Sequence, residues 1–188
     1  MISTGPYPFV DAEIDCRHDQ SDKTAELSRR RQHLRRCRDA AGSSCKPDFD
    51  PKHGVFTLAK PLMAGLTYPY DWGFIPSTKA EDGDPLDVLI LHDAQTYPGV
   101  VLRCRPVGIL EVEQRSKGKK ERNDRVFAVP DRSPLETDLK DIRNLPSHAR
   151  DDLEQFFRAT NALENKELKF LGWHGPNRAA KTIKRLAR

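Results

Sequence analysis

The sequence predicts a small β-barrel followed by packing helices, with strands in most of the chain and helices at its C-terminal end. Two observations predict this fold class. Short apolar stretches separated by Gly, Pro and Asp turns recur from residue 49 to residue 129, as is typical of small barrels. After residue 146, the apolar side chains repeat at helical spacing instead. A chain of 188 residues is long enough to bury a core of its own.

The first part of the chain differs from the rest. We expect residues 1–45 to form a divergent basic N-terminal arm or insert, ahead of a main domain at residues 46–188. Within the arm, residues 10–14 suit a short strand. Residues 22–41 suit a helix capped by Asp22, although its apolar periodicity is poor.

The strands of the main domain are expected between well-marked turns. Turns are predicted at residues 50–54 and 97–99, and a charged hairpin around residues 117–119. Residues 88–91 are continuously apolar and are expected to be a buried strand. Strands or extended segments are predicted at residues 55–58, 71–76, 88–91, 100–105, 107–113 and 125–129.

Two helices are expected at the C-terminal end. Ser147 follows a proline and is a suitable N-cap for the first, and the second follows Gly175. The apolar face of the first helix would comprise Leu153, Phe156, Phe157, Thr160 and Leu163. The inward face of the second would comprise Ala180, Ile183 and Ala187.

Charge is distributed unevenly along the chain. Six of the 32 basic residues are arginines within residues 29–38, and without those six the chain has 26 basic and 28 acidic residues. The body of the protein is therefore mildly acidic, which argues against nucleic acid as a partner.

The cysteines and the hydropathy pattern bear on location. The four cysteines form no CxxC pair, so we expect reduced thiols. No apolar run approaches the roughly 18 residues needed to cross a bilayer. The first residues lack a basic region followed by an apolar one. We therefore expect no membrane association and a cytoplasmic location.

Residues 81–93, EDGDPLDVLILHD, place three aspartates directly ahead of the buried strand. In an extended chain Asp82 and Asp84 point the same way, and the bend at Pro85 can bring Asp87 back toward them. Carboxylate oxygens are hard ligands that suit Mg²⁺, Mn²⁺ or Ca²⁺. The sequence therefore predicts a cup of three carboxylates that holds a divalent cation, with a solvated Asp-Gly turn as the alternative.

Two other sites are excluded by the residues present. An EF-hand loop beginning at Asp82 would have Pro85, Leu86 and Asp87 at its fourth, fifth and sixth positions, where the sixth requires glycine. No Gly-rich phosphate loop followed by Lys and Ser or Thr occurs in the chain.

Three segments resemble the soluble family I inorganic pyrophosphatases: residues 68–76 (YPYDWGFIP), 82–89 (DGDPLDVL) and 99–108 (GVVLRCRPVG). The resemblance extends from about Lys46 to the C-terminus. It implies an α+β fold, a five-stranded OB-like barrel with helices packed outside, which assembles as a homo-oligomer. It also implies Mg²⁺-dependent hydrolysis of inorganic pyrophosphate to two orthophosphates.

The resemblance also implies roles for individual residues. Asp84 would be the general base on the attacking water. The metal ligands would be Asp82, Asp84, Asp87 and Asp124. The substrate-binding residues would be Lys46, Lys60, Trp72 and Arg125. Lys60 stands where the family usually has arginine, and Trp72 where tyrosine is common.

The chain departs from the family pattern at several of these positions. Gln114 stands where an aspartate is expected. A second aspartate position falls on Asn123 or on Asp124, depending on a one-residue choice of strand register, and we choose Asp124.

Two further departures lie at the ends of the match. Thr160 and Asn161 replace a Tyr-Lys pair, whose contacts Lys166 or Lys169 could make instead. The family has a glutamate about nine residues before the lysine, whereas Glu13 precedes Lys46 by 33 residues.

Two alternative functions remain beside hydrolysis of pyrophosphate. One is a protein of the same fold with weak or no activity, because several expected site residues differ. The other is a nucleic-acid-binding barrel whose basic arm, residues 29–38, contacts phosphates without sequence preference.

Overall fold

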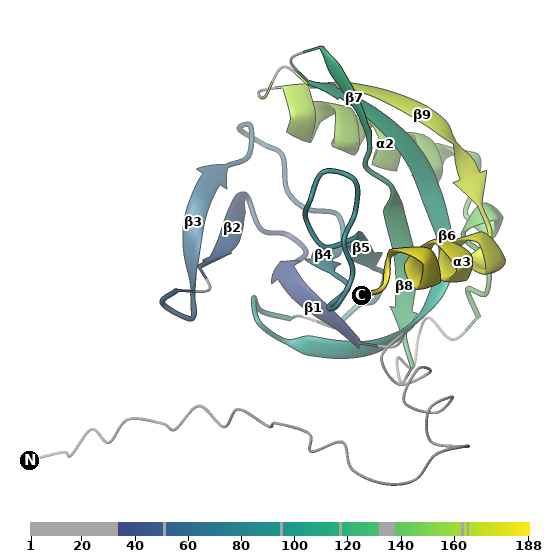
Figure 1. The fold of residues 1–188 in the computed structure, drawn as a ribbon, viewed down its shortest axis with the longest axis horizontal. Coiled ribbons are helices and arrows are strands. Elements are labelled where there is room, and N and C mark those ends of the chain that lie inside the picture. The colour runs from purple at the N-terminus through teal and green to yellow at the C-terminus, as the bar shows by residue number, and fades with distance from the viewer. Residues whose placement is uncertain are drawn as a thin grey trace, which may run out of the picture.

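The computed structural model describes residues 34–50, 52–94, 96–116, 118–131, 138–162, 164 and 166–188. Within these residues the protein is mostly β-structure with two α-helices, and the helices flank a strongly curved sheet (Figure 1). The strand predicted at residues 10–14 and the larger part of the helix predicted at residues 22–41 lie outside the described residues.

The strands form two sheets. The main sheet has seven strands: β1 (Leu34–Asp39), β4 (Asp71–Phe74), β5 (Asp87–Ile90), β6 (Val101–Ser116), β7 (Lys119–Arg122), β8 (Arg125–Pro130) and β9 (Glu167–His174). The second sheet is the hairpin of β2 (Cys45–Asp50) and β3 (Val55–Pro61), which projects from the main body (Figure 1).

The main sheet curls back on itself. The pairing runs from β1 through β4, β5 and β8 to β6, and the beginning of β6 returns to β1. That return consists of three residue pairs, from Leu34↔Arg103 to Arg36↔Val101, so the ladder of a fully closed barrel is not completed. Strands β5 and β8 are parallel, with Val88 opposite Val126.

Successive residues of the central strands enter two different cores, as the period of two in a strand requires. In β5, Leu89 packs with Phe127 and the helix residue Phe157, whereas Val88 packs with Val126 on the other side. Both faces of these strands are therefore covered, which explains why residues 88–91 are continuously apolar.

Each helix covers one of these cores. Helix α2 (Ser147–Ala162) buries Leu153, Phe156 and Phe157, three of the residues predicted for its inner face. Helix α3 (Pro176–Leu186) lies against β6 (Figure 1). A short 3₁₀ turn, η1 (Ile142–Asn144), precedes α2.

The inner face of α3 corrects the prediction made for it. Ala179, Thr182 and Ile183 are buried, whereas Ala187 is exposed and follows the end of the helix. Position 179 rather than position 180 therefore faces the core, one step round the helix from the predicted face.

Other elements also differ from the predictions. Residues 34–39 form strand β1 and not the end of a helix, because pairing with β4 and β6 outweighs a weak local helical preference. Strand β6 is continuous where two strands were expected, and β9 was not predicted. Strand β1 also precedes the domain boundary expected at residue 46, yet it belongs to the main sheet.

Candidate active site

The loop between β4 and β5 carries the aspartate cluster, and the side chain of Thr78 helps to close it. The hydroxyl of Thr78 donates to the carbonyl of Ile75 (2.6 Å) and accepts from the amide of Leu86 (2.9 Å). Gly83 has a φ of +94° within the turn, a conformation that favours glycine. These contacts hold the end of the loop, next to β5, against its beginning, next to β4.

The end of α3 supports the same loop from outside. The amide of Lys79 donates to the carbonyl of Leu186, and the amide of Arg188 donates to the carbonyl of Ser77, each over 2.9 Å. Thr78 and Ala187 form an antiparallel bridge between these two segments. The residues that lead into the aspartate cluster are therefore held against the C-terminal part of the chain.

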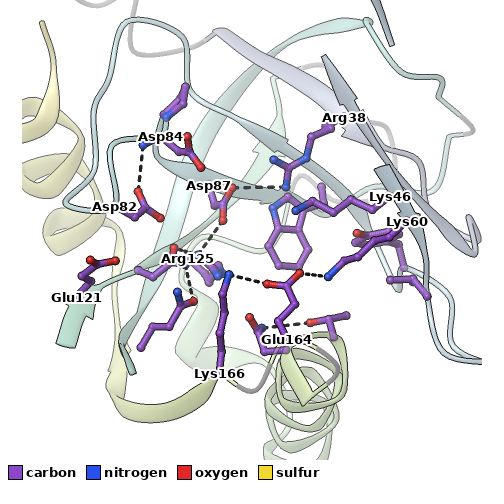
Figure 2. A pocket seen from close by; sticks show the side chains of 18 of the residues that line it. Arg38, Lys46, Lys60, Asp82, Asp84, Asp87, Glu121, Arg125, Glu164 and Lys166 are labelled. Atoms are coloured by element: carbon purple, nitrogen blue, oxygen red, sulfur yellow. Dashed lines mark hydrogen bonds and ion pairs between the residues drawn. The ribbon is translucent and has the colours of Figure 1, made fainter. Parts of the chain in front are cut away.

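The aspartates lie in a turn and not in the extended chain that we expected. The amide of Asp84 donates to Oδ1 of Asp82 over 3.2 Å. Asp82, Asp84 and Asp87 nevertheless line one cavity of about 500 Å³, as predicted (Figure 2). Removal of the Asp82 carboxyl from water raises its pKa, and the negative charges of Asp87 and Asp84 add to the shift.

Two lysines face this cavity from the β2–β3 hairpin. Lys46 and Lys60 occupy directly opposite positions of the two strands, and both line the cavity (Figure 2). Like charges opposite one another destabilise a sheet. Partial burial lowers the pKa of Lys60, and the positive charges of Lys46 and Lys166 lower it further. The pair is therefore a place where an anion would relieve repulsion.

Glu164 supplies a negative charge at this end of the cavity. Its carboxylate forms an ion pair with Lys60 and another with Lys166, the latter at 2.5 Å. Lys166, which follows helix α2, thereby joins the lysines of the hairpin at the cavity (Figure 2).

Two arginines hold Asp87. Its Oδ2 lies 2.8 Å from Nη1 of Arg125, and its Oδ1 lies 3.8 Å from Nη2 of Arg38 (Figure 2). Burial opposes the charge of Arg38, but the Asp87 and Asp39 carboxylates raise its pKa overall. Burial lowers the pKa of Arg125, although Asp87 and Asp82 counteract that shift. An arginine remains charged even so.

Asn123 and Asp124 were the two candidates for one aspartate position of the family pattern. The structure places Asn123 at the cavity. Its Nδ2 donates to Oε1 of Gln114 over 3.0 Å, and its Oδ1 accepts from Arg125. Asp124 points elsewhere, because neighbouring residues of an extended chain face opposite sides. Its Oδ1 accepts from the amide of Val112 (3.0 Å) and pairs with Arg122 (2.8 Å) in a separate cavity. The structure does not bring Asp124 to the other predicted ligands.

The remaining predicted residues lie in the cavity wall. Trp72 is buried beneath the guanidinium of Arg125, whose central carbon is 5.2 Å from the ring centroid. Within the described residues its indole N–H has no hydrogen-bond partner. Thr160 and Asn161 also line the cavity, and Asn161 donates back to the carbonyl of Phe157. Glu13 lies outside the described residues.

The oxygen donors fit a divalent cation in part. Asp82 and Asp84 form no ion pair with a cationic side chain in the described ranges, so their charges are available. Asp87 is neutralised by two guanidinium groups. Across the part of the chain that the structure describes, no group of three His, Cys, Asp or Glu side chains converges as a metal cluster. The fit therefore extends to Asp82 and Asp84 but not to Asp87 or Asp124.

Sequence reasoning missed four charged residues of this cavity: Arg38, Lys119, Glu121 and Glu164. Arg38 precedes Lys46 by eight residues, close to the spacing at which the family pattern has a glutamate. That spacing was a usable signal, but the surrounding arginines suggested a solvated basic segment.

Carboxylates on one loop lie at the same cavity as several lysines and arginines. Oxygen ligands suit a divalent cation and charged N–H donors suit phosphate groups. No helix in the described residues is long and apolar enough to span a membrane.

Comparison with known proteins identifies the family to which the chain belongs. The family model for inorganic pyrophosphatases matches residues 40–188, and the chain belongs to the inorganic pyrophosphatase family. It is 41% identical to the inorganic pyrophosphatase of Synechocystis over 133 residues, 71% of this chain and 76% of the relative. It is 37% identical to that of Sulfolobus acidocaldarius over 153 residues, 78% of this chain and 86% of the relative.

Solved structures give the same answer. The crystal structure of the Thermus thermophilus inorganic pyrophosphatase superposes with a TM-score of 0.74 at 33% identity, covering 81% of this chain and 87% of that one. The Helicobacter pylori enzyme superposes with a TM-score of 0.73 at 30% identity, over 81% and 89%. The family and the soluble pyrophosphatase fold predicted from the sequence are confirmed.

Proposed function

We propose that this protein hydrolyses inorganic pyrophosphate to two orthophosphates in the cavity between the β2–β3 hairpin and the β4–β5 loop. The observation that carries the proposal is the meeting of opposite charges there. Asp82 and Asp84 line the same cavity as Lys46, Lys60 and Arg125. Membership of the inorganic pyrophosphatase family supports the same substrate.

The cationic side chains bind and orient the substrate. Lys46 and Lys60 donate to oxygens of one phosphate, relieving their mutual repulsion. Arg125 is a further donor in the cavity wall, and the indole N–H of Trp72, which is buried without a hydrogen-bond partner in the described residues, is a donor that the substrate could engage. Charge grows on the departing phosphate during hydrolysis, so fixed cations stabilise the transition state.

Asp84 is the general base in this proposal. Its carboxylate accepts the proton of the water that attacks phosphorus. The side chain lies in the cavity, and in the described residues it is not tied up by an ion pair. The amide of Asp84 is fixed by Asp82, which positions the base relative to the loop.

Asp82 and Asp84 would hold Mg²⁺. This ion commonly binds through one or two carboxylates together with substrate phosphates and water, so the two aspartates suffice. When bound, Mg²⁺ neutralises the phosphates and lowers the pKa of the attacking water.

A phosphate-release assay with pyrophosphate and Mg²⁺ tests this function. We expect hydrolysis that stops when a chelator is added and returns when Mg²⁺ is restored in excess. Absence of phosphate release at saturating pyrophosphate, over a range of Mg²⁺ concentrations, would refute hydrolysis as the function.

A protein that binds pyrophosphate but turns it over weakly is the second candidate. Two amides, Gln114 and Asn123, and the arginine pair on Asp87 favour it, because they reduce the number of free carboxylates. Tight binding by calorimetry combined with negligible phosphate release would identify this case.

We also propose a cytoplasmic homo-oligomer. Among the described residues, Cys37 and Cys45 are thiols that form no disulfide, which suits a reducing compartment. Val55 and Leu58 expose 49% and 68% of their surface on β3, and a second copy could cover these apolar side chains. Light scattering coupled to size exclusion should give a mass above the 21.4 kDa of one chain.

A further inference from the structure

Asp87 lies between two guanidinium groups. One of its oxygens lies 2.8 Å from Arg125 and the other 3.8 Å from Arg38. The side chains of Arg125, Asp87 and Arg38 are 5%, 17% and 19% exposed, so water screens these charges little. Both carboxylate oxygens are thus engaged by guanidinium groups.

Each arginine is anchored on a second side, so these contacts are built into the fold. Arg38 pairs with the fully buried Asp39 through Nε at 3.1 Å. Arg125 lies over the ring of Trp72 and donates to Asn123. If a guanidinium moved away from Asp87, it would also have to give up its second partner, which is Asp39 for Arg38 and Asn123 for Arg125.

The charges of this group balance without an added ion. Arg38 and Arg125 carry two positive charges, and Asp87 and Asp39 carry two negative charges. A divalent cation bound to Asp87 would lie next to two fixed cations and would be repelled by both. Asp82 and Asp84, by contrast, form no ion pair within the described residues, although the positive charge of Arg125 acts on Asp82 from a greater distance.

We propose that the Arg38 and Arg125 guanidinium groups take the place of one divalent cation at Asp87, so that metal ions bind at Asp82 and Asp84 alone. Both arginines line the cavity, and each guanidinium has five N–H donors. Donors not used by Asp87 can reach phosphate oxygens. Pyrophosphate would therefore bind measurably before any metal is added. This inference rests on the proposed function in that pyrophosphate is taken as the ligand.

Mn²⁺ binding, followed by electron paramagnetic resonance without substrate, tests the replacement. The experiment compares wild type with Asp87→Asn, and Arg38→Ala with the double variant Arg38→Ala/Asp87→Asn. We expect Asp87→Asn to change the Mn²⁺ dissociation constant of wild type by less than twofold. In the Arg38→Ala background, where Asp87 is less neutralised, the same change should weaken Mn²⁺ binding at least tenfold. A tenfold loss from Asp87→Asn in wild type would overturn the proposal.

Arg38→Lys is the matched control, because it keeps a cation near Asp87. Its Mn²⁺ affinity should follow wild type, and a new Asp87-dependent Mn²⁺ site in this variant would contradict the proposal. Circular dichroism and urea unfolding establish that each variant is folded.

A second measurement keeps the inference testable if the Asp87 variants do not fold. Calorimetry with pyrophosphate in excess chelator should show binding to wild type, weakened at least tenfold in Arg38→Ala. No detectable binding to wild type would overturn the proposal. These readouts do not depend on turnover, so a protein without phosphate release could still satisfy them, and an active enzyme could still fail them.

Discussion

Arg125 and Asp87 begin two neighbouring parallel strands, and their side chains form a 2.8 Å ion pair at the cavity. Because Val88 pairs with Val126, the residues that precede them, Asp87 and Arg125, lie side by side. One strand register thus fixes both the core packing and the relation between a carboxylate and a cation of the site.

Removing the Arg125 guanidinium should destabilise the protein strongly. Arg125→Met leaves Asp87 with the more distant Arg38 and leaves Asn123 without its buried donor, so we expect a loss of about 3–5 kcal/mol in the free energy of unfolding. Urea denaturation measures this loss. Arg103→Met, at an exposed position of β6, is the control and should change stability little. A loss of less than about 1 kcal/mol from Arg125→Met would contradict the structural weight given to this pair.

Replacing the proposed base should strongly reduce turnover. Asp84→Asn keeps the shape of the side chain but removes its ability to accept a proton, so phosphate release should fall by about 10²–10⁴-fold. Asp93→Asn alters an exposed aspartate outside the cavity and should behave as wild type. Undiminished phosphate release by Asp84→Asn would remove Asp84 from this role.

The indole N–H of Trp72 should contribute to substrate affinity. Trp72→Phe retains an aromatic ring against Phe157, whose centroid is 5.6 Å away, but loses the indole N–H. We expect KM for pyrophosphate to rise about 2- to 10-fold, the value of one hydrogen bond. Trp173→Phe is the matched control, because that indole donates to Glu154 instead. Equal KM values in the two variants would argue against a substrate contact by Trp72.

Asp39 should make stability depend on pH in an unusual direction. Burial raises its pKa to about 6, although Arg38 acts against the shift. Because the folded state then binds the proton more tightly than the unfolded state, stability due to this group falls as pH rises from about 4 to 6. Relative to wild type, Asp39→Asn should gain about 2 kcal/mol in unfolding free energy between pH 4.5 and pH 7.5. A constant difference across this pH range would contradict the prediction.

The aspartate loop and the strand after it could be predicted because their signals are local. Gly83 and Pro85 mark the turn, and the apolar run at residues 88–91 marks a strand covered on both faces. The relation of Asp87 to its arginines could not be predicted in this way. It depends on strand pairings between segments far apart in the sequence.

Two predictions differ from the structure, each for its own physical reason. Most residues of β1 are charged or polar, so local preference favoured a helix, whereas pairing with β4 and β6 decides the structure. Asp124 was chosen over Asn123, but its side chain does not line the cavity. A single step along an extended chain turns the side chain to the opposite face of the sheet. Asp124 was preferred because a carboxylate is the better metal ligand, whereas the strand geometry places the amide of Asn123 at the cavity.

The pairing of residues 77–79 with the end of α3 has a practical consequence for production of the protein. A purification tag joined after Arg188 would begin directly beside the segment that leads into Asp82 and Asp84. Such a tag could disturb the alignment of the loop while leaving the folded core intact. Preparations with and without a C-terminal tag should therefore be compared before a low turnover is attributed to the sequence itself.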